Sequence, residues 1–398
     1  MPRTIDNGWS RLSGAIEGVR LPAALVDLDA FDRNADVLFG LANTHQKRLR
    51  VATKSVRVPA LIRRLVDRGG RGLMCYAAAE ARHLAEVHGF DDLLVAYPTL
   101  QAQDLDDLAF LAASGRDVSL VVDSIEHVER AAARAKGIGA TLSLVIEIDL
   151  ALEKLGMRIG ALRSPIHDVE TAVRLAEHIE ETPHVRFHGV MGYEAHVAGL
   201  PDRGRTKRWQ NPIKRALKLA SRGPLEHRRA DLREALREKG LQPTVYNGGG
   251  SGSLAWCVRE AALTEVTAGS GFLDGHLFDG YRDVTFEPAL LFALSIGRAP
   301  APGIVTANGG GYIASGEAGV DRLPIPWAPP GLSLTTVEGA GEVQTPILGS
   351  KTLKPGDPVF FRPAKTGELA ERFNEYLLIS GDRIAERVPT YRGEGKTF

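Results

Sequence analysis

The chain has 398 residues, enough for one large domain or two of moderate size with a substantial core. Lys plus Arg and Asp plus Glu are equal at 49 each, so the formal net charge is zero and nothing suggests a nucleic-acid or membrane partner. The two cysteines, Cys75 and Cys257, lack the spacing of a disulfide framework or a zinc finger. No apolar run reaches the ~20 residues that span a bilayer, and no signal peptide is apparent. We expect a cytoplasmic protein.

Short apolar segments alternate with longer amphipathic ones from about residue 21 to residue 279, which is typical of strand and helix units around a parallel sheet. Leaving out the first strand-like segment gives eight strands, close to the ~250-residue pattern of a (β/α)₈ TIM-type barrel. We predict this barrel over residues 30–280. An open, doubly wound sheet is the alternative, but no strand is followed by GxGxxG. The nine strand-like segments are 24–28, 49–54, 72–76, 93–98, 118–123, 142–149, 185–194, 244–249 and 264–269.

After about residue 286 the pattern changes to short strands between Gly and Pro turns, with little helical sequence. This indicates a smaller all-β domain, which we assign to residues 1–29 and 281–398, with the leftover strand 24–28 pairing into it from the other end of the chain. Its predicted strands are 289–296, 304–308, 341–345, 358–361 and 376–380.

Lys54 ends the apolar strand 49–54, and Pro59 is placed to open the next helix. The lysine amine is therefore expected at the carboxyl-terminal mouth of the barrel, where barrel enzymes have their active sites. A partly desolvated lysine in such a mouth is a usable amine for imine formation. The alternative interpretation is a solvated lysine at a strand end.

Two glycine-rich turns follow the seventh and eighth barrel strands. Residues 247–253 read Asn-Gly-Gly-Gly-Ser-Gly-Ser, and residues 268–271 read Ala-Gly-Ser-Gly. Such turns let backbone N–H groups converge on a phosphate, and barrels often bind phosphate with the loops after these two strands. Lys54 on the first strand would lie beside them in a closed barrel. A lysine that can hold an aldehyde, next to turns that can hold a phosphate, suggests pyridoxal 5'-phosphate (PLP) as the cofactor.

The chain resembles the fold type III PLP enzymes, which share the alanine racemase N-terminal barrel. Within them it is similar to the D-threonine aldolase and D-serine dehydratase group, also called amino acid deaminase/aldolase. The resemblance covers nearly the whole chain. It is carried by residues 21–28, by Thr53-Lys54-Ser55 with Arg57 and Pro59, by Met191-Gly192-Tyr193-Glu194-Ala195-His196, by both glycine turns and by residues 341–345.

This resemblance implies a set of site residues. Lys54 would be the Schiff-base lysine, Tyr193 would lie beside the cofactor ring, and Arg158 would lie near the cofactor oxygen. His196 is a candidate proton carrier or a packed histidine. The implied phosphate ligands are Gly248, Gly249, Ser251, Gly269 and Ser270.

The β domain of this family usually carries a histidine followed two residues later by cysteine or aspartate, which bind a divalent metal. Here Pro363 and Lys365 stand at those positions, and neither ligates a metal. We expect no metal site of that kind. Our hypothesis is that the Lys365 ammonium binds the substrate hydroxyl or carboxylate, and a solvated lysine is the alternative.

The expected activity is retro-aldol cleavage of a small β-hydroxy D-amino acid by a PLP-dependent lyase, since elimination of the hydroxyl asks more of a Lewis acid. Elimination of the D-serine dehydratase type, an amino acid racemase and a non-catalytic PLP-binding protein are the alternatives. The resemblance also implies a homodimer.

Overall fold

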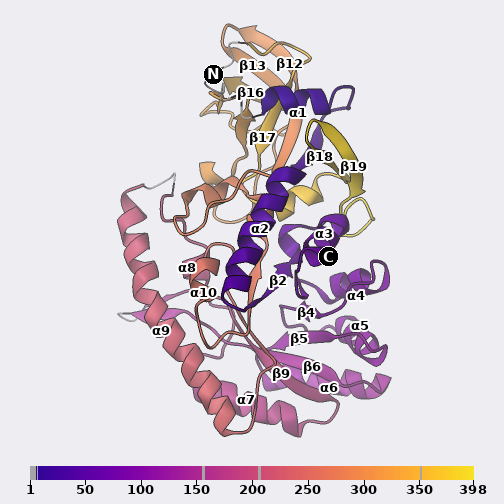
Figure 1. The fold of residues 1–398 in the computed structure, drawn as a ribbon, viewed down its shortest axis with the longest axis vertical. Coiled ribbons are helices and arrows are strands. Elements are labelled where there is room, and N and C mark those ends of the chain that lie inside the picture. Colours follow the sequence, from indigo (N-terminus) through magenta and orange to yellow (C-terminus); the bar gives the residue numbers. More distant parts are fainter. Residues whose placement is uncertain (1–5, 7, 155–156, 205–207, 350–351) are drawn as a thin grey trace.

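Eight short runs of apolar and β-branched residues form a closed parallel barrel (Figure 1). The computed structural model describes residues 6, 8–154, 157–204, 208–349 and 352–398. The strand order is β10-β11-β2-β3-β4-β5-β6-β9, with β9 pairing back to β10, so the predicted (β/α)₈ barrel is confirmed. The strands are β2 (Arg48–Ala52), β3 (Leu73–Cys75), β4 (Leu93–Val95), β5 (Val118–Val122), β6 (Leu142–Glu147), β9 (Val185–Gly192), β10 (Val245–Gly248) and β11 (Glu265–Ala268).

A ring of helices covers the barrel. Pro59 is the first residue of α3, as predicted, because proline has no N–H to lose at that position. The last two helices, α10 and α11, are single turns, and α2 completes the ring by packing on α11 through Phe31 and Phe272. The ring helices are α2 (Leu28–Thr44), α3 (Pro59–Asp67), α4 (Ala78–Glu86), α5 (Ala102–Ala113), α6 (Ile125–Ile138), α7 (Val169–Glu181), α8 (Ala195–Ala198), α9 (Asn211–Glu238), α10 (Leu254–Cys257) and α11 (Ser270–Leu273).

A buried ion pair joins the first and last barrel strands. The Arg50 guanidinium on β2 donates to both carboxylate oxygens of Glu265 on β11, at 2.7 and 3.0 Å. Both side chains are almost fully buried, so the pair fills the end of the barrel opposite the carboxyl ends of the strands. Bidentate geometry offsets part of the cost of desolvating the two charges.

The second part of the molecule is a mostly β domain at the top of Figure 1. The predicted strand near the amino terminus, β1, lies between β12, which is antiparallel to it, and β18, which is parallel. The expected pairing of this strand with the far end of the chain is therefore observed. The strands are β1 (Ala23–Asp27), β12 (Leu290–Ala301), β13 (Ile304–Asn308), β14 (Ile325–Ala328), β15 (Ser333–Leu334), β16 (Gln344–Leu348), β17 (Pro358–Arg362), β18 (Glu375–Ser380) and β19 (Arg383–Pro389).

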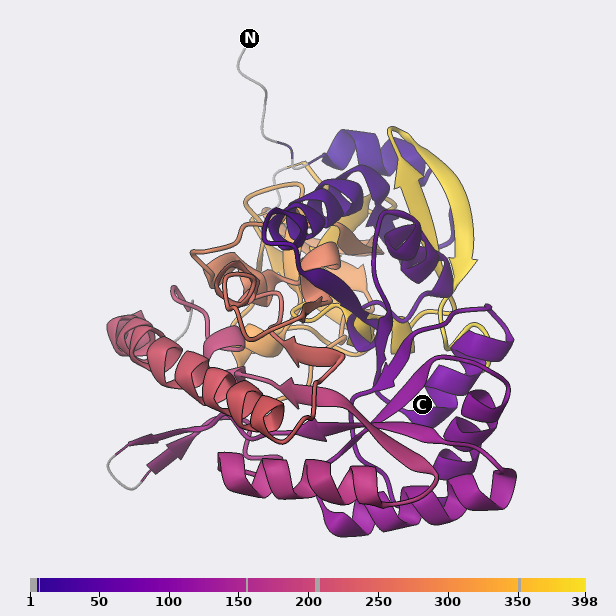
Figure 2. The ribbon, with the colours of Figure 1, turned by 60° about the horizontal axis from the view of Figure 1, so that its bottom comes forward.

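One predicted strand of this domain was misplaced, and several elements were missed. Residues 341–343 form a bend, because Thr345 Oγ1 accepts the Gly341 N–H and donates to the Gly309 carbonyl, so β16 begins only at Gln344. The sequence analysis also missed β14, β15, β19 and the hairpin of β7 (Leu152–Lys154) and β8 (Met157–Ile159). Figure 2 shows this hairpin projecting from the barrel beside α9.

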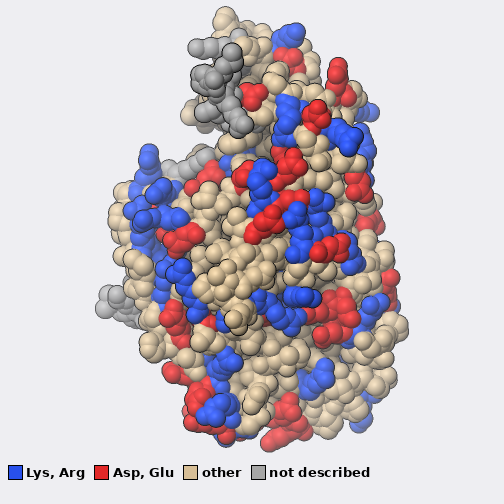
Figure 3. All heavy atoms as spheres, in the orientation of Figure 1, with Lys and Arg blue, Asp and Glu red and all other residues tan. Residues whose placement is uncertain are grey.

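Basic and acidic side chains are intermixed over the face of the molecule in Figure 3, in keeping with a net charge of zero. Within the described residues, no helix combines the length and apolar character needed to cross a membrane. The domain boundaries, 30–280 against 1–29 with 281–398, stay a prediction. Short helical segments complete the chain: α1 (Trp9–Ala15), η1 (Thr53–Ser55), η2 (Arg208–Gln210), η3 (His276–Gly280), η4 (Val320–Arg322) and η5 (Gly367–Glu371).

Candidate active site

Lys54 lies at the mouth of the barrel, in the 3₁₀ turn η1 rather than on the strand itself. β2 ends at Ala52, and Thr53 Oγ1 donates to the Met74 carbonyl at 2.9 Å, which ties the turn to the neighbouring strand β3. The Lys54 side chain enters a cavity, where Nζ donates to Tyr97 Oη at 2.9 Å. The expected position of the amine is thus observed.

The β domain holds the backbone of this turn in place. Thr366 Oγ1 donates to the Ser55 carbonyl at 2.8 Å, and Arg57 Nε donates to the Lys54 carbonyl at 3.0 Å. Arg57 is in turn ion-paired to Glu371 of η5. Gly367 approaches so closely that an added Cβ would lie 1.9 Å from the Lys54 carbonyl oxygen. Only glycine fits there without moving one of the two domains.

The two glycine turns lie next to each other at the same mouth. Gly249 has φ +90°, a conformation that favours glycine, and Ser251 Oγ accepts the N–H groups of Gly269 and Gly271 at 3.2 and 2.9 Å. Ser270 Oγ lies 3.1 Å from Ser55 Oγ, which joins the second turn to η1. Within the described residues, the backbone N–H groups of Ser251, Gly252 and Ser270 have no acceptor.

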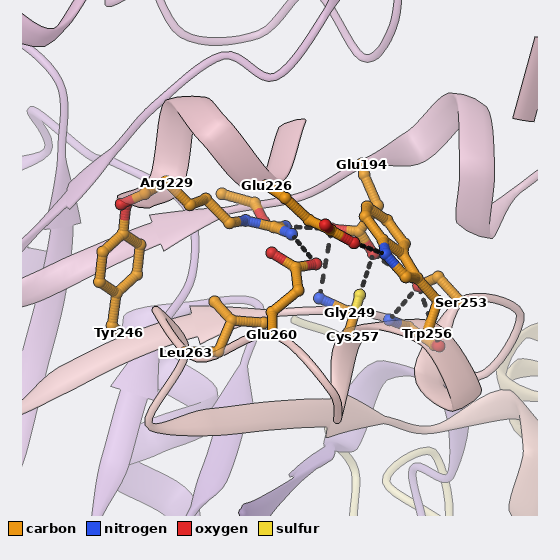
Figure 4. Close-up of polar contacts among 12 residues, drawn as sticks. Glu194, Glu226, Arg229, Tyr246, Gly249, Ser253, Trp256, Cys257, Glu260 and Leu263 are labelled. Atoms are coloured by element: carbon orange, nitrogen blue, oxygen red, sulfur yellow. Dashed lines mark hydrogen bonds and ion pairs between the residues drawn. The ribbon is translucent and has the colours of Figure 1, made fainter. Parts of the chain in front are cut away.

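A buried charge pair supports the first glycine turn (Figure 4). Glu194 lies two residues after the end of β9, is fully buried, and accepts hydrogen bonds from Ser253 Oγ at 2.5 Å and from the Gly249 N–H at 3.3 Å. The Arg229 guanidinium of α9 forms an ion pair with Glu194 and another with Glu260 at 2.6 Å. Burial by itself would raise the pKa of Glu194, but Arg229 and the hydrogen bonds outweigh it and hold that pKa below its usual value.

The cavity is lined by the carboxyl ends of the barrel strands and by the two turns. Burial alone would raise the pKa of Tyr97. The charge and the hydrogen bond of Lys54 outweigh burial, so the net effect is a lowered pKa. Glu147, at the end of β6, is almost fully buried in the lining, and burial together with Asp123 and Asp149 raises its pKa to about 7 despite Arg163. The site therefore holds a carboxyl group that titrates near neutral pH.

A second, wider cavity adjoins the first between the barrel and the β domain. Lys54, Ser55, Tyr193 and Ser270 line both cavities, so the two communicate. Lys365 lines only the outer cavity, where its Nζ donates to Ser315 Oγ at 2.9 Å and lies 3.3 Å from Glu368 Oε1. The β domain thus forms part of the wall of the outer cavity, and this cavity leads to Lys54.

The structure brings most, but not all, of the predicted site residues to the inner cavity. Its lining includes Lys54, Tyr193, Gly249, Ser251, Gly269 and Ser270. Three others lie outside both linings. Gly248 faces the Arg229 side chain. His196 is buried, and within the described residues neither of its ring nitrogens has a hydrogen-bond partner. Burial lowers the pKa of His196. Arg158, on the hairpin, is ion-paired to Asp149 at 2.6 Å.

Three titratable residues of the lining were not predicted from the sequence: Tyr97, Glu147 and Arg163. Tyr97 and Glu147 stand at or just after the ends of β4 and β6, and that position is the signal that could have found them. Arg163 follows the missed hairpin, and its guanidinium lies 5.9 Å from the centre of the Tyr97 ring. No local pattern marks it.

Comparison with known proteins places the chain in a family. Residues 26–273 match the family described as alanine racemase, N-terminal domain, and because this is more than half of the chain, the protein belongs to that family. The predicted recognition as a fold type III PLP enzyme is confirmed.

Individual proteins are similar to this chain at low sequence identity. The chain is 25% identical to D-threonine aldolase of Arthrobacter sp over 343 residues, which are 83% of each protein. The solved structure of D-threonine aldolase from Filomicrobium marinum is 22% identical with a TM-score of 0.81, covering 94% of this chain and 96% of that one. The structure of D-threo-3-hydroxyaspartate dehydratase from Delftia sp. HT23 is 20% identical with a TM-score of 0.76, covering 94% and 98%. These structural likenesses establish the fold.

The contact between Gly367 and Lys54 gives a prediction on stability. We expect Gly367→Ala to lower the free energy of unfolding by about 1–3 kcal/mol, because its Cβ would overlap the Lys54 carbonyl oxygen. Urea denaturation measures this change. Gly137→Ala is the control, since the site is in helix α6 with open space around it. Equal stability of the two variants would contradict the close contact.

The raised pKa of Glu147 gives a prediction on pH. The folded protein keeps the Glu147 proton up to about pH 7, whereas the unfolded chain loses it near the ordinary pKa of 4.5. Stability should therefore fall as the pH rises from about 4.5 to about 7, by roughly 3 kcal/mol from this group. In Glu147→Gln this part of the pH dependence should disappear. Unfolding curves of both proteins across that range test it, and parallel curves would refute the assignment.

Proposed function

We propose that this chain is a PLP-dependent lyase of the D-threonine aldolase type, which cleaves a small β-hydroxy D-amino acid into glycine and an aldehyde. The main support is one observation: Lys54 lines the same cavity at the barrel mouth as Ser251, Gly252 and Ser270, whose backbone N–H groups have no acceptor among the described residues. The predicted enzyme class, a lyase, is confirmed by the aldolases and dehydratases among the similar proteins.

The residues of the cavity fit PLP. Lys54 Nζ is the amine that would hold its aldehyde, and the free N–H groups of the two turns would hold its phosphate. The turns have no room for side chains: a Cβ on Gly250 would lie 3.2 Å from the Tyr193 ring, and one on Gly252 would lie 2.3 Å from the Ala198 carbonyl oxygen. We propose Tyr193, Gly249, Ser251, Gly269 and Ser270 as further cofactor contacts. The roles predicted for Gly248, His196 and Arg158 stay predictions.

When bound, PLP withdraws the electrons of the bond that breaks at Cα of the substrate. The chain supplies the rest. Lys54 Nζ is placed to carry a proton to or from the substrate, and its hydrogen bond to Tyr97 Oη, whose pKa is lowered, orients the amine. The cations of Lys54 and Arg163 near Glu147 give the cavity a positive field that suits a carboxylate substrate.

We also propose that Lys365 binds the substrate in place of a metal. Its ammonium lies in the outer cavity that communicates with Lys54, and Ser315 and Glu368 orient it there. An ammonium can donate to a hydroxyl or a carboxylate but cannot ligate a metal. Retro-aldol cleavage needs a proton acceptor for the substrate hydroxyl more than a Lewis acid, which favours cleavage over elimination.

A cytoplasmic homodimer remains part of the proposal. Cys75 and Cys257 are both free and buried, which suits a reducing compartment. Cyclic two-fold assembly is the commonest arrangement of soluble oligomers.

The activity is tested by incubating the PLP-loaded protein with D-threonine, D-serine and D-alanine. We expect aldehyde release from D-threonine, and we expect Lys54→Ala to lose both this activity and a visible absorbance band that borohydride bleaches. Keto acid release would instead identify a dehydratase, and loss of optical activity would identify a racemase. A PLP-binding protein would change none of the substrates.

The role of Lys365 is tested with Lys365→Met, which keeps the aliphatic stem and removes the charge. We expect kcat/KM to fall by about 10- to 100-fold, the loss of a charge-assisted hydrogen bond, while EDTA leaves the wild-type rate unchanged. Lys354→Met is the control, because Lys354 is exposed and lines neither cavity. A divalent ion that binds in the outer cavity beside Lys365 and is required for turnover would overturn the proposal.

A further inference from the structure

A group of metal-ligating side chains lies outside both cavities. His83 in the last turn of α4, His88 in the turn that follows, and Glu394 near the carboxyl end of the chain point their ligand atoms at one another. In Figure 1 this end of the chain lies beside α3 and α4. None of the three residues lines the cavities at the barrel mouth.

The ligand atoms are nearly in place for a small cation. Nε2 of His83 lies 2.7 Å and Nε2 of His88 lies 3.1 Å from the same oxygen, Glu394 Oε2, and all three atoms lie within 4.8 Å of one another. A tetrahedral zinc ion, with bonds of about 2.0–2.2 Å, separates its ligand atoms by about 3.4 Å. To admit the ion, the two nitrogen–oxygen distances would have to widen by about 0.7 Å and about 0.3 Å.

The charge of Glu394 also calls for a cation. Within the described residues, its ion-pair partners are the two histidines, and no Lys or Arg pairs with it. The three side chains are 8%, 23% and 15% exposed, so the carboxylate is largely removed from water. A largely buried carboxylate is stabilised by a counter-charge, which a bound cation would supply.

The backbone holds the three ligands independently of any ion. The Arg63 guanidinium donates to the His88 carbonyl at 2.6 Å. The turn that carries Glu394 is fixed by its N–H bond to the Thr390 carbonyl at 3.0 Å and by the Lys396 N–H bond to the Tyr391 carbonyl at 2.8 Å. Such preorganisation lowers the entropy that an ion would have to offset on binding.

We propose that His83, His88 and Glu394 form a structural zinc site that fastens the carboxyl-terminal segment to the barrel. Two imidazole nitrogens and one carboxylate oxygen are ligands that Zn²⁺ prefers, and water would complete the tetrahedron. Binding would displace the protons that now lie between the histidines and Glu394.

The fastened segment contacts the turn that carries Lys54. The Tyr391 N–H donates to the Arg57 carbonyl at 3.0 Å, and Tyr391 Oη donates to the buried Glu80 at 2.8 Å. Arg57 in turn donates to the Lys54 carbonyl. An ion at this site therefore stabilises a neighbour of the catalytic lysine without touching substrate.

The site is tested by titrating Zn²⁺ into the purified, PLP-loaded protein by calorimetry, with thermal melting as a second readout. We expect one ion per chain and a rise in Tm. His83→Ala, His88→Ala and Glu394→Gln should each weaken binding by more than about 100-fold, since the loss of a direct ligand exceeds the usual effect of a residue that only supports one. Glu394→Gln keeps the shape of the side chain, which guards against loss of folding.

Two controls separate this site from other zinc binding. His127→Ala should bind Zn²⁺ like the wild type, because the His127 side chain lies apart from the cluster and, among the described residues, pairs with Asp123 and Ser124. Lys365→Met should also bind normally, since Lys365 belongs to the outer cavity. If the wild type takes up no stoichiometric zinc, or if the three ligand variants bind it equally well, the cluster is a hydrogen-bonded triad and the proposal is wrong. Neither result depends on the aldolase activity.

Discussion

The position of Lys54 depends on the contact between two backbones. The carbonyl groups of Lys54 and Ser55 accept hydrogen bonds from Arg57 and Thr366, and Gly367 packs directly against the first of them. Because these partners come from both the barrel and the β domain, the amine is fixed only when the two domains are together. An active-site lysine needs this support, since a displacement of about 1 Å costs about two orders of magnitude in rate.

The glycine turns depend on a different kind of support. Among the described residues, the N–H groups of Ser251, Gly252 and Ser270 have no acceptor, while other N–H groups of the turns are bonded and hold the turns in shape, with Glu194 as one acceptor. Glu194 and Arg229 are fully buried, so the pair adds little net stability, but removing one partner would cost about 3–5 kcal/mol. We infer that the ion pair positions the Gly249 turn and adds little to the stability of the fold.

The sequence predicted those parts of the site that follow local rules. Lys54 after an apolar strand, Pro59 at a helix start and two glycine turns after consecutive strands can each be recognised within a few residues. Arg163 could not be found in this way, because it reaches the cavity from a segment beyond an unpredicted hairpin. His83 and Glu394 are 311 residues apart, and only the folded chain brings them together. The bend at Gly341 was missed because it depends on a hydrogen bond to distant Gly309.

The place of β1 in its sheet has a consequence for synthesis. This strand is made first, yet its two neighbours, β12 and β18, begin at Leu290 and Glu375. A growing chain must complete all eight barrel strands before residues 23–27 meet either neighbour. Until then an apolar strand has both edges unpaired, a state that is prone to association with other chains. The large sequence separation between β1 and its two partners also makes this pairing slow. The edges of β1 are covered only after β12 and β18 have been synthesised.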